Sequence, residues 1–342
     1  MNRAIPFVFV LTATVAVSSF SAPPEPADKT RAKAFAANAA LARGINLGNA
    51  LDAPTEGDWG VTLEADYFKR IADAGFKTVR LPVRWSAYAK ADAPYTIDPP
   101  FFRRVDWALD RAAANGLNVV LNVHHYDEMN KEPKAHLPRL VGLWEQIAAR
   151  YKDRPASVVF ELFNEPNGAF DATWNDAIPA VLKSVRATNP TRPVIVGPGG
   201  WNNVWALPKL KLPNDPNLIL TVHFYEPFKF THQGAPWGPD DVKNLSGIKW
   251  EGTDTELKAL RKSLDDVEVW AKKADVPVFV GEFGAYEKAE LPSRAKWTAA
   301  VVKECEARGF SWAYWEFCAN FGAYDRDKKA WRDPLLKALQ PK

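Results

Sequence analysis

The sequence predicts an α/β protein that folds as a single (β/α)8 barrel. Short apolar segments alternate with amphipathic helical segments along most of the 342 residues. The short segments are apolar at consecutive positions, as is typical of parallel strands covered by helices. Glycine and proline recur at the turns, for example in Ala74-Gly75 and Asn189-Pro190. Eight such strand–helix units in one chain of this length favour a closed barrel of the TIM type.

The expected strands share this apolar character and end at turn residues. In chain order they are residues 44–47, 78–82, 118–124, 158–163, 194–196, 218–223, 277–281 and 310–317. The helical segments have apolar residues at helical spacing and are residues 63–74, 100–115, 140–151, 172–188, 255–274 and 292–308. The insert after the sixth strand, residues 226–254, is rich in Trp, Pro and Gly and is expected to form a loop over one end of the barrel.

A doubly wound sheet is the competing architecture. It usually has a glycine-rich phosphate-binding turn after its first strand, whereas the turn here reads Asn46-Leu47-Gly48-Asn49-Ala50. The chain contains no internal repeat and no low-complexity linker that would separate a second domain. We therefore expect one (β/α)8 domain over residues 41–342.

The N-terminal residues have the features of a secretory signal peptide. Arg3 provides a positive charge, residues 5–17 are apolar, and residues 18–22 supply the small residues of a cleavage site. This pattern predicts a signal peptide over residues 1–22 and a loose leader over residues 23–40, and hence a secreted or periplasmic protein. No later apolar stretch is long enough for a membrane span. The net charge of +3, without a block of Lys or Arg, argues against nucleic-acid binding.

The two cysteines are expected to stay unpaired. Cys305 lies near the end of a helical segment, and Cys318 follows the last strand. That strand separates them by about 25 Å at roughly 3.3 Å per residue, whereas a disulfide requires Cα atoms within about 7 Å. We predict two free, mostly buried thiols.

Two glutamates follow apolar strands. Glu165 stands in Asn164-Glu165-Pro166 and Glu282 in Gly281-Glu282-Phe283. A carboxylate that ends a buried strand is either a defect in a core or a functional group at the rim of the sheet. Two such carboxylates that face each other are what cleavage of a glycosidic bond requires, one as the acid and one as the nucleophile or base.

Polar and aromatic residues follow seven of the eight expected strands. The carboxyl ends of barrel strands share one rim, which is where barrel enzymes place their catalytic groups. The residues expected at this rim are Asn46, Asn49, Arg80, His124, His125, Asn164, Glu165, His223, Tyr225, Glu282, Trp315 and Glu316. Exposed members of the 14 Trp residues are candidates for stacking on sugar rings.

The whole mature chain resembles glycoside hydrolase family 5, the cellulase-type retaining enzymes that fold as (β/α)8 barrels. Seven motifs carry the resemblance: Gly44-Ile45-Asn46-Leu47-Gly48-Asn49, Val79-Arg80-Leu81-Pro82, Asn122-Val123-His124-His125-Tyr126, Asn164-Glu165-Pro166, His223-Phe224-Tyr225, Gly281-Glu282-Phe283-Gly284 and Tyr314-Trp315-Glu316-Phe317. Asn-Glu-Pro alone would be a weak signal, but all seven motifs in this order at barrel spacing are specific.

The resemblance implies that Glu165 is the acid/base and that Glu282 is the nucleophile. Arg80 and a hydrogen bond from Tyr225 are expected to keep the pKa of Glu282 low. Apolar neighbours and the charge on Glu282 are expected to keep Glu165 protonated.

The resemblance also implies the surroundings of the sugar at the cleavage site. His223 would orient Glu165, and Asn164 would donate to the sugar 2-OH. The other implied substrate-binding residues are His124 at the cleavage site, Trp315 as its floor, His125 and Asn49 at nearby hydroxyls, and Trp237 stacked on the next ring.

Several of these residues have a purely structural interpretation. Without the other motifs, a role of Arg80 in an ordinary structural ion pair would explain it as well as a role in the site. Without the glutamates beside them, Tyr225 and Trp315 are more typical of core aromatics. No Cys or carboxylate cluster in the sequence completes a metal site with His124 and His125, so we expect no metal and no cofactor.

Three further carboxylates need separate interpretations. Glu161 is interpreted as a structural carboxylate inside the barrel, and Glu316 as a weaker candidate for substrate contact. Asp52 stands where the family pattern has Glu, so its side chain is one methylene shorter.

The favoured function is a secreted, monomeric, retaining endo-β-1,4-glucanase that acts on β-linked polysaccharides or oligosaccharides. An endo-β-1,4-mannanase, or an enzyme with both activities, stays open because glucose and mannose differ only in the direction of the 2-OH. A non-catalytic carbohydrate-binding barrel would have lost one of the two glutamates, and both are present. A barrel enzyme for phosphorylated metabolites is opposed by the export signal and by the lack of a glycine-rich anion loop.

Overall fold

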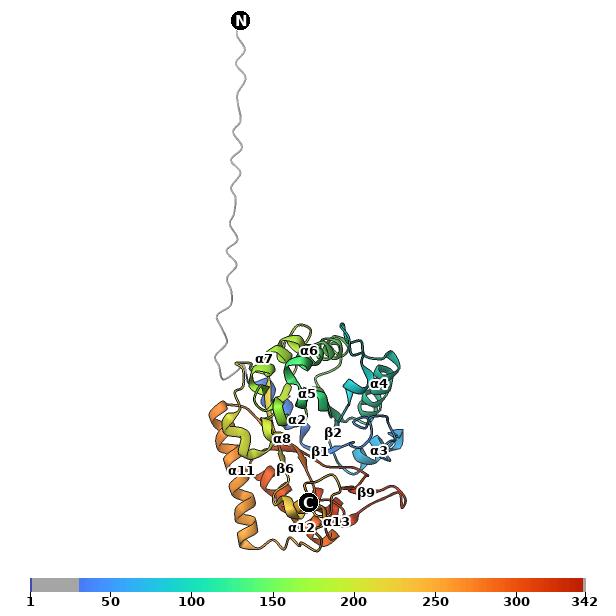
Figure 1. Ribbon diagram of the computed structural model, residues 1–342, viewed down its shortest axis with the longest axis vertical. Coiled ribbons are helices and arrows are strands. Elements are labelled where there is room, and N and C mark those ends of the chain that lie inside the picture. The colour runs from blue at the N-terminus through green and yellow to red at the C-terminus, as the bar shows by residue number, and fades with distance from the viewer. Residues whose placement is uncertain (2–30, 341–342) are drawn as a thin grey trace.

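Eight parallel strands close into a barrel in sequence order, so the predicted (β/α)8 fold is confirmed. The computed structural model describes residue 1 and residues 31–340. The strands are β1 (Arg43–Asn46), β2 (Thr78–Leu81), β3 (Asn118–Asn122), β4 (Val158–Glu161), β5 (Val194–Val196), β6 (Leu218–Phe224), β7 (Val278–Phe283) and β8 (Ser311–Tyr314). Figure 1 shows the long helices arranged around this ring.

All six predicted helices are present. The long helices are α3 (Ala65–Asp73), α4 (Pro99–Ala114), α6 (Pro133–Arg150), α7 (Trp174–Arg186), α11 (Asp254–Ala274) and α12 (Leu291–Ala307). Helix α6 begins seven residues before the predicted start, at Pro133, because proline is accommodated in the first turn of a helix. The short α13 (Asp333–Leu339), which the sequence did not reveal, packs beside α12.

Short elements occupy the loops at the C-terminal ends of the strands. They are η1 (Trp85–Tyr88), α5 (Asp127–Lys131), η2 (Gly168–Phe170), α8 (Gly199–Asn202), η3 (Val204–Lys209), α9 (Phe228–Thr231) and α10 (Asp240–Lys243), with a small antiparallel pair of β9 (Tyr324–Asp325) and β10 (Ala330–Trp331). Between β5 and β6 the described residues form only α8 and η3. The insert 226–254 contains α9 and α10 and does reach the C-terminal end of the barrel, as predicted, because His232 and Trp237 line the cleft there.

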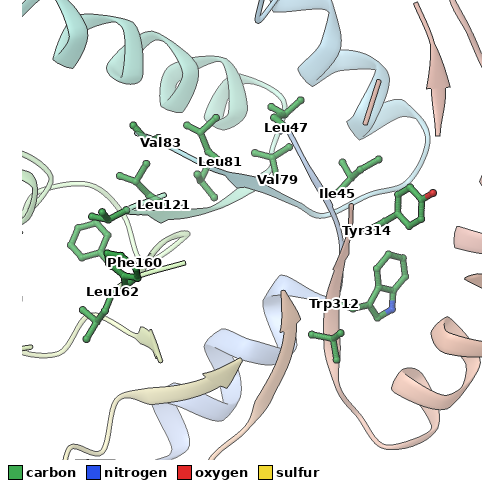
Figure 2. Packing of buried hydrophobic residues seen from close by; sticks show 14 of the residues in the cluster. Ile45, Leu47, Val79, Leu81, Val83, Leu121, Phe160, Leu162, Trp312 and Tyr314 are labelled. Carbon is green, nitrogen blue, oxygen red and sulfur yellow. The ribbon is translucent and has the colours of Figure 1, made fainter. Parts of the chain in front are cut away.

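The outward faces of the strands form the main hydrophobic core with the helices. Ile45, Val79, Leu121, Phe160 and Trp312 are buried in this core. Figure 2 shows these side chains together with others of the same cluster. Because alternate strand residues point to opposite faces, this core uses one half of each strand's residues and leaves the other half to the barrel interior.

A helix before the first strand belongs to the barrel domain. Helix α2 (Ala32–Leu41) lies largely within the predicted leader, residues 23–40. Its buried Ala34 and Leu41 pack against Val120, Ile219 and Phe279 from the barrel strands. The predicted boundary at residue 41 is therefore too late, because residues 32–40 are part of the packed domain. The predicted signal peptide, and the leader up to residue 30, lie outside the described residues apart from Met1.

Cys305 and Cys318 are both free and buried, so that prediction is confirmed. Within the described part of the chain, no helix combines the length and the apolar character needed to cross a membrane.

Candidate active site

Arg80 on β2 connects the polar groups at the centre of the site and is fully buried. Its guanidinium donates to both carboxylate oxygens of Glu161 at 2.7 Å and to Oε1 of Glu282 at 2.7 Å. It also donates to the side-chain oxygens of Asn46 at 2.9 Å and Asn164 at 2.7 Å. A guanidinium has five N–H groups in a rigid plane, so Arg80 can satisfy all of these acceptors at once. The predicted structural role of Glu161 is confirmed, since both of its oxygens are bound by this arginine.

Glu165 and Glu282 face each other at the C-terminal rim. One oxygen of each carboxyl and a ring nitrogen of His223 all lie within 4.8 Å of one another. His223 Nδ1 lies 2.7 Å from Glu165 Oε1 and 3.6 Å from Glu282 Oε2. The Tyr225 hydroxyl donates to Glu282 Oε2 at 2.8 Å. Oxygens this close agree with the roughly 5–5.5 Å between the carboxyl groups of retaining glycosidases.

Local backbone irregularities aim these side chains. The pairing of β6 with β7 shifts between Val222 and His223, so that His223 lies beside Glu282 instead of Gly281. Such bulges re-aim side chains next to active sites. Glu165 has a φ of 50°, in the left-handed region that side chains rarely adopt. Strain of this kind persists only where the surrounding structure enforces it, and it is concentrated at functional sites.

Burial raises the pKa of both glutamates. It raises the pKa of Glu165 to about 7, with Arg80 opposing and the charge of Glu161 contributing to the rise. The predicted repulsion between the two carboxyls is present, and it contributes to the raised pKa of Glu282. Burial also raises the pKa of Glu282 above its ordinary value, although His223, Arg80 and Tyr225 oppose it. The predicted low pKa of Glu282 is therefore wrong in direction, because desolvation outweighs the partners.

The partners still distinguish the two carboxyls. Glu282 accepts hydrogen bonds from Arg80 and Tyr225, which stabilise its ionised form. Glu165 is bonded to His223, and burial lowers the pKa of that imidazole to about 4. A neutral imidazole positions Glu165 but brings no positive charge that would offset a negative charge on it. Glu165 is therefore the carboxyl suited to carrying a proton at neutral pH, and Glu282 the one suited to being charged.

A cleft of about 670 Å³ opens above the two glutamates. Nine of the eleven predicted site residues line it: Asn49, His124, His125, Asn164, Glu165, Tyr225, Trp237, Glu282 and Trp315. The other two, Arg80 and His223, are buried beneath it and hold the glutamates. Trp315 packs against Gly48, where a Cβ would lie 2.7 Å from the indole ring, so the floor of the cleft depends on glycine at this position.

Seven cleft residues are absent from the predicted set of site residues: Asp52, Trp59, Arg84, Asp127, His232, Asn320 and Phe321. Most of them lie several residues beyond a strand end, where the rule that rim residues follow strands no longer applies. Trp59 is 40% exposed and packs edge-on against His125, with ring centroids 5.2 Å apart. Exposure is the property that would have identified Trp59 as a candidate sugar-binding residue. Composition does not show which of the tryptophans are exposed.

Glu316 and Asp52 support loops. Glu316 is fully buried and accepts the backbone N–H groups of Cys318 at 2.8 Å and Ala319 at 2.7 Å. It does not line the cleft, so its interpretation as a substrate contact is wrong. Asp52 reaches the cleft wall, yet its carboxyl accepts the backbone N–H groups of Asn49 at 3.1 Å and Ala50 at 2.8 Å. It therefore holds the loop that carries Asn49.

The structure places the carboxyl of Asp52 beside His124 and His125. The sequence did not indicate this proximity. Asp52, His124 and His125 have donor atoms within 4.8 Å of one another. Burial raises the pKa of Asp52 to about 7, and both of its carboxyl oxygens already accept backbone N–H groups, from Asn49 and Ala50. Asn122 Nδ2 lies 3.2 Å from His124 Nδ1 and Asn122 Oδ1 accepts from Val83 N, which orients the amide to donate to Nδ1. His124 then carries its proton on Nε2, which suits donation to a sugar hydroxyl.

Comparison with known proteins yields one family and a consistent set of relatives. The family profile described as cellulase (glycosyl hydrolase family 5) matches residues 39–321. Endoglucanase H of Acetivibrio thermocellus is 35% identical over 87% of this chain and 33% of that protein. Endoglucanase 3 of Fibrobacter succinogenes is 26% identical over 84% of this chain and 51% of that protein. The chain thus spans between about a third and a half of these curated relatives.

Solved structures of similar chains cover the same region. Thermotoga maritima Cel5A, described in complex with cellobiose, is 46% identical, with a TM-score of 0.88 over 90% of this chain and 100% of that one. The same enzyme is also described in complex with mannotriose, again at 46% identity and a TM-score of 0.88.

Proposed function

The chain belongs to glycosyl hydrolase family 5, and from this premise we propose that it is a retaining endo-β-1,4-glucanase. The observation that carries the proposal is the pair of facing carboxyls. One oxygen of each lies within 4.8 Å of the other, and their partners favour a proton on Glu165 and a charge on Glu282. The cleft of about 670 Å³ also offers the aromatic rings of Trp237 and Trp315, on which sugar rings of a polysaccharide can stack.

In the first step Glu282 attacks the anomeric carbon while Glu165 donates its proton to the glycosidic oxygen. The bond from the anomeric carbon to that oxygen breaks, the leaving sugar departs as an alcohol, and a glycosyl ester forms on Glu282. The side-chain oxygen of Asn164 accepts from Arg80 at 2.7 Å, so its amide N–H groups are left to face the sugar 2-OH. That hydrogen bond strengthens as positive charge develops on the ring.

In the second step Glu165, now ionised, takes a proton from a water molecule. The resulting nucleophile attacks the anomeric carbon, breaks the ester to Glu282 and restores both carboxyls to their starting states. Two inversions leave the product with the β configuration of the substrate. His223 keeps Glu165 in place through both steps, since its bond to Oε1 is 2.7 Å long.

The proposal is tested by assaying purified protein on carboxymethylcellulose, glucomannan, galactomannan and xylan, with sizing of the products. We expect release of short β-1,4-gluco-oligosaccharides and a rapid fall in the viscosity of carboxymethylcellulose. Proton NMR of the early products should show the β anomer. Hydrolysis of none of these polymers, or an initial α anomer, would refute the proposal.

A second candidate activity is endo-β-1,4-mannanase, alone or together with the glucanase. The observation in its favour is the 46% identity to Thermotoga maritima Cel5A, for which structures with both cellobiose and mannotriose are described. Hydrolysis of galactomannan in the same assay would identify mannanase activity, and hydrolysis of carboxymethylcellulose would identify glucanase activity.

We further propose that the protein is exported and acts as a monomer. The first claim rests on the signal-like residues 1–22 and is tested by fractionating cells and sequencing the mature N-terminus. The second is tested by light scattering of the purified protein.

A further inference from the structure

Asn202, in the loop after β5, lies beside the histidine that holds the acid/base. Its side chain is fully buried, and its Nδ2 lies 3.4 Å from Nε2 of His223. The opposite ring nitrogen of His223, Nδ1, lies 2.7 Å from Oε1 of Glu165. The three side chains therefore form a row that ends at the acid/base. Asn202 does not line the catalytic cleft, so it can influence the reaction only through His223.

The surroundings of Nδ1 decide which ring nitrogen of His223 carries the proton. Nδ1 faces two carboxyl groups, because Oε2 of Glu282 lies 3.6 Å away, in addition to the closer Oε1 of Glu165. A bare Nδ1 would direct its lone pair at the charge of Glu282, whereas an N–H group at this position is attracted to both carboxyls. Burial lowers the pKa of His223 to about 4, so the ring is neutral and carries one proton. With that proton on Nδ1, Nε2 is an acceptor, and the amide N–H of Asn202 is placed to donate to it.

The backbone that carries Asn202 is strained and is held from two sides. Trp201 and Asn202 have φ values of 59° and 55°, in the left-handed region that side chains rarely adopt. Such strain persists only where the surrounding structure enforces it, and it is concentrated at functional sites. On one side, Trp201 N donates to the carbonyl oxygen of Pro166 at 3.1 Å. On the other side, Asn203 forms an isolated parallel bridge with His223, which fixes the loop against β6.

The packing around the Asn202 amide serves its N–H group and leaves its oxygen unpaired. A Cβ on Gly197 would lie 2.5 Å from Oδ1 of Asn202, and one on Gly281 would lie 3.1 Å from Nε2 of His223, so glycine at both positions makes room for the pair. Among the described residues, this buried Oδ1 has no hydrogen-bond partner. Burial of an unpaired acceptor is unfavourable. The orientation is explained if Nε2 of His223 requires a donor.

The tautomer of His223 determines which oxygen of Glu165 carries the catalytic proton. When Nδ1–H donates to Oε1, the proton of Glu165 is on Oε2, which is left for the glycosidic oxygen. In the other tautomer Nδ1 is an acceptor, and the proton of Glu165 would lie on Oε1 and point at the imidazole instead of the substrate.

We propose that Asn202 is a positioning residue that fixes His223 in the Nδ1–H tautomer and so keeps the acid proton on Oε2 of Glu165. This inference rests on the proposed function and adds to it a residue outside the cleft that acts on the acid/base through another side chain.

The tautomer is measured by 15N NMR of protein labelled at histidine, because protonated and unprotonated ring nitrogens have different chemical shifts. The signals of His223 are assigned by their absence from the spectrum of His223→Gln. In the wild type we expect Nδ1 to be protonated. Asn202→Gly accommodates the positive φ and removes the donor, so the Nε2–H form should appear. A wild-type protein with the proton on Nε2 would overturn the inference, even if Asn202→Gly does not fold.

Aryl β-cellobiosides with leaving groups of different acidity give the kinetic readout. Phenyl β-cellobioside needs the proton of Glu165 in the first step, whereas the 2,4-dinitrophenyl substrate needs none. For the phenyl substrate, Asn202→Gly should lower kcat/KM by about tenfold, a part of the roughly 10²–10⁴-fold that a general acid supplies. For the 2,4-dinitrophenyl substrate, kcat/KM should change little. An equal loss on both substrates would assign Asn202 a purely structural role and overturn the inference.

Asn203→Ala is the matched control in the same loop. It removes the hydrogen bond that Asn203 Oδ1 accepts from Trp205 N at 3.3 Å, but it leaves the amide of Asn202 in place. His223 should keep the Nδ1–H tautomer, and the ratio of kcat/KM between the two substrates should stay as in the wild type. The same changes as in Asn202→Gly would mean that the loop, and not the Asn202 amide, sets the tautomer, which would overturn the inference. A wild-type protein that hydrolyses no β-glycoside would refute the proposed function instead, and NMR would still decide the tautomer.

Discussion

The interior of the barrel has an apolar half and a polar half, although the same strands build both. On β3, Val120 lies in the apolar half and Asn122 in the polar half, and on β4 the corresponding residues are Val159 and Glu161. Two residues along a strand give the same face about 7 Å higher in the barrel. The side chains inside the barrel therefore change from apolar to polar between two successive residues on the same face of a strand.

The two halves are stabilised in different ways. The apolar half is covered by α2, whose Leu41 is 1% exposed, and it gains stability from burial of hydrocarbon. The polar half buries Arg80 with Glu161 and Glu282, and its charges are tolerated only because each has partners. The apolar half therefore stabilises the folded state. That stability allows the polar half to hold charged groups in the fixed positions that the reaction requires.

Removal of either catalytic carboxyl should abolish the function of the polar half. We expect Glu282→Gly and Glu165→Ala each to lower kcat on polysaccharide drastically, the former on the order of 10⁵-fold, without loss of folding. With azide and an activated β-glycoside, Glu282→Gly should give an α-glycosyl azide by one inversion. Glu165→Ala should give a β-glycosyl azide by two. The anomers are read by NMR, and exchanged anomers would reverse the assigned roles.

Removal of Arg80 should affect both stability and activity. Arg80→Ala leaves Glu161 buried without its partner, which we expect to lower the free energy of unfolding by about 3–5 kcal/mol. Activity should fall at all pH values because Glu282 also loses its cation, which raises its pKa and misplaces it. Denaturant unfolding and pH–rate profiles measure the two effects. The double variant Arg80→Ala/Glu161→Ala is the control and should be more stable than Arg80→Ala alone, since no unpaired Glu161 remains.

A cavity in the apolar half should affect stability alone. We expect Leu41→Ala to lower the free energy of unfolding by about 2–5 kcal/mol while kcat/KM and its pH profile stay as in the wild type. Phe35→Ala on the same helix is the matched control, because Phe35 is 45% exposed. A change in the pH optimum of Leu41→Ala would show that the two halves are not separable.

The pH dependence of kcat/KM should reveal the different proton affinities of the two carboxyls in the polar half. Glu165 must carry a proton, and its pKa is raised to about 7, so kcat/KM should decline as the pH rises through that region. Glu282 must be ionised, and because burial raises its pKa, the acid limb should lie above the ordinary glutamate value of about 4.3. The limbs belong to the coupled pair. With a leaving group that needs no acid, Glu165→Ala should lose the alkaline limb, and persistence of that limb would exclude Glu165 as its source.

The barrel and the centre of the site could be predicted from the amino-acid sequence alone. Apolar strands, turn residues and helical spacing are local signals, so all eight strands were located close to their observed bounds. Glu165 and Glu282 could be identified because a residue that ends a parallel barrel strand must lie at the common rim. The position of these two residues at the rim does not depend on how distant loops pack.

The detailed properties of the site depend on packing that no sequence pattern revealed. The pKa of Glu282 is raised because burial outweighs the opposing effect of Arg80, which lies 202 positions away in the sequence. No local sequence pattern contains this balance. Trp59, Arg84 and Asp127 reach the cleft from loops whose course is set by packing, and Glu316 is withdrawn from it by three backbone N–H groups of the loop that follows. Helix α2 belongs to the domain because it covers the apolar half of the barrel, although its own residues read as a leader. Contacts between segments far apart in the chain make these distinctions, because burial and electrostatic energies depend on distance in space and not on distance along the sequence.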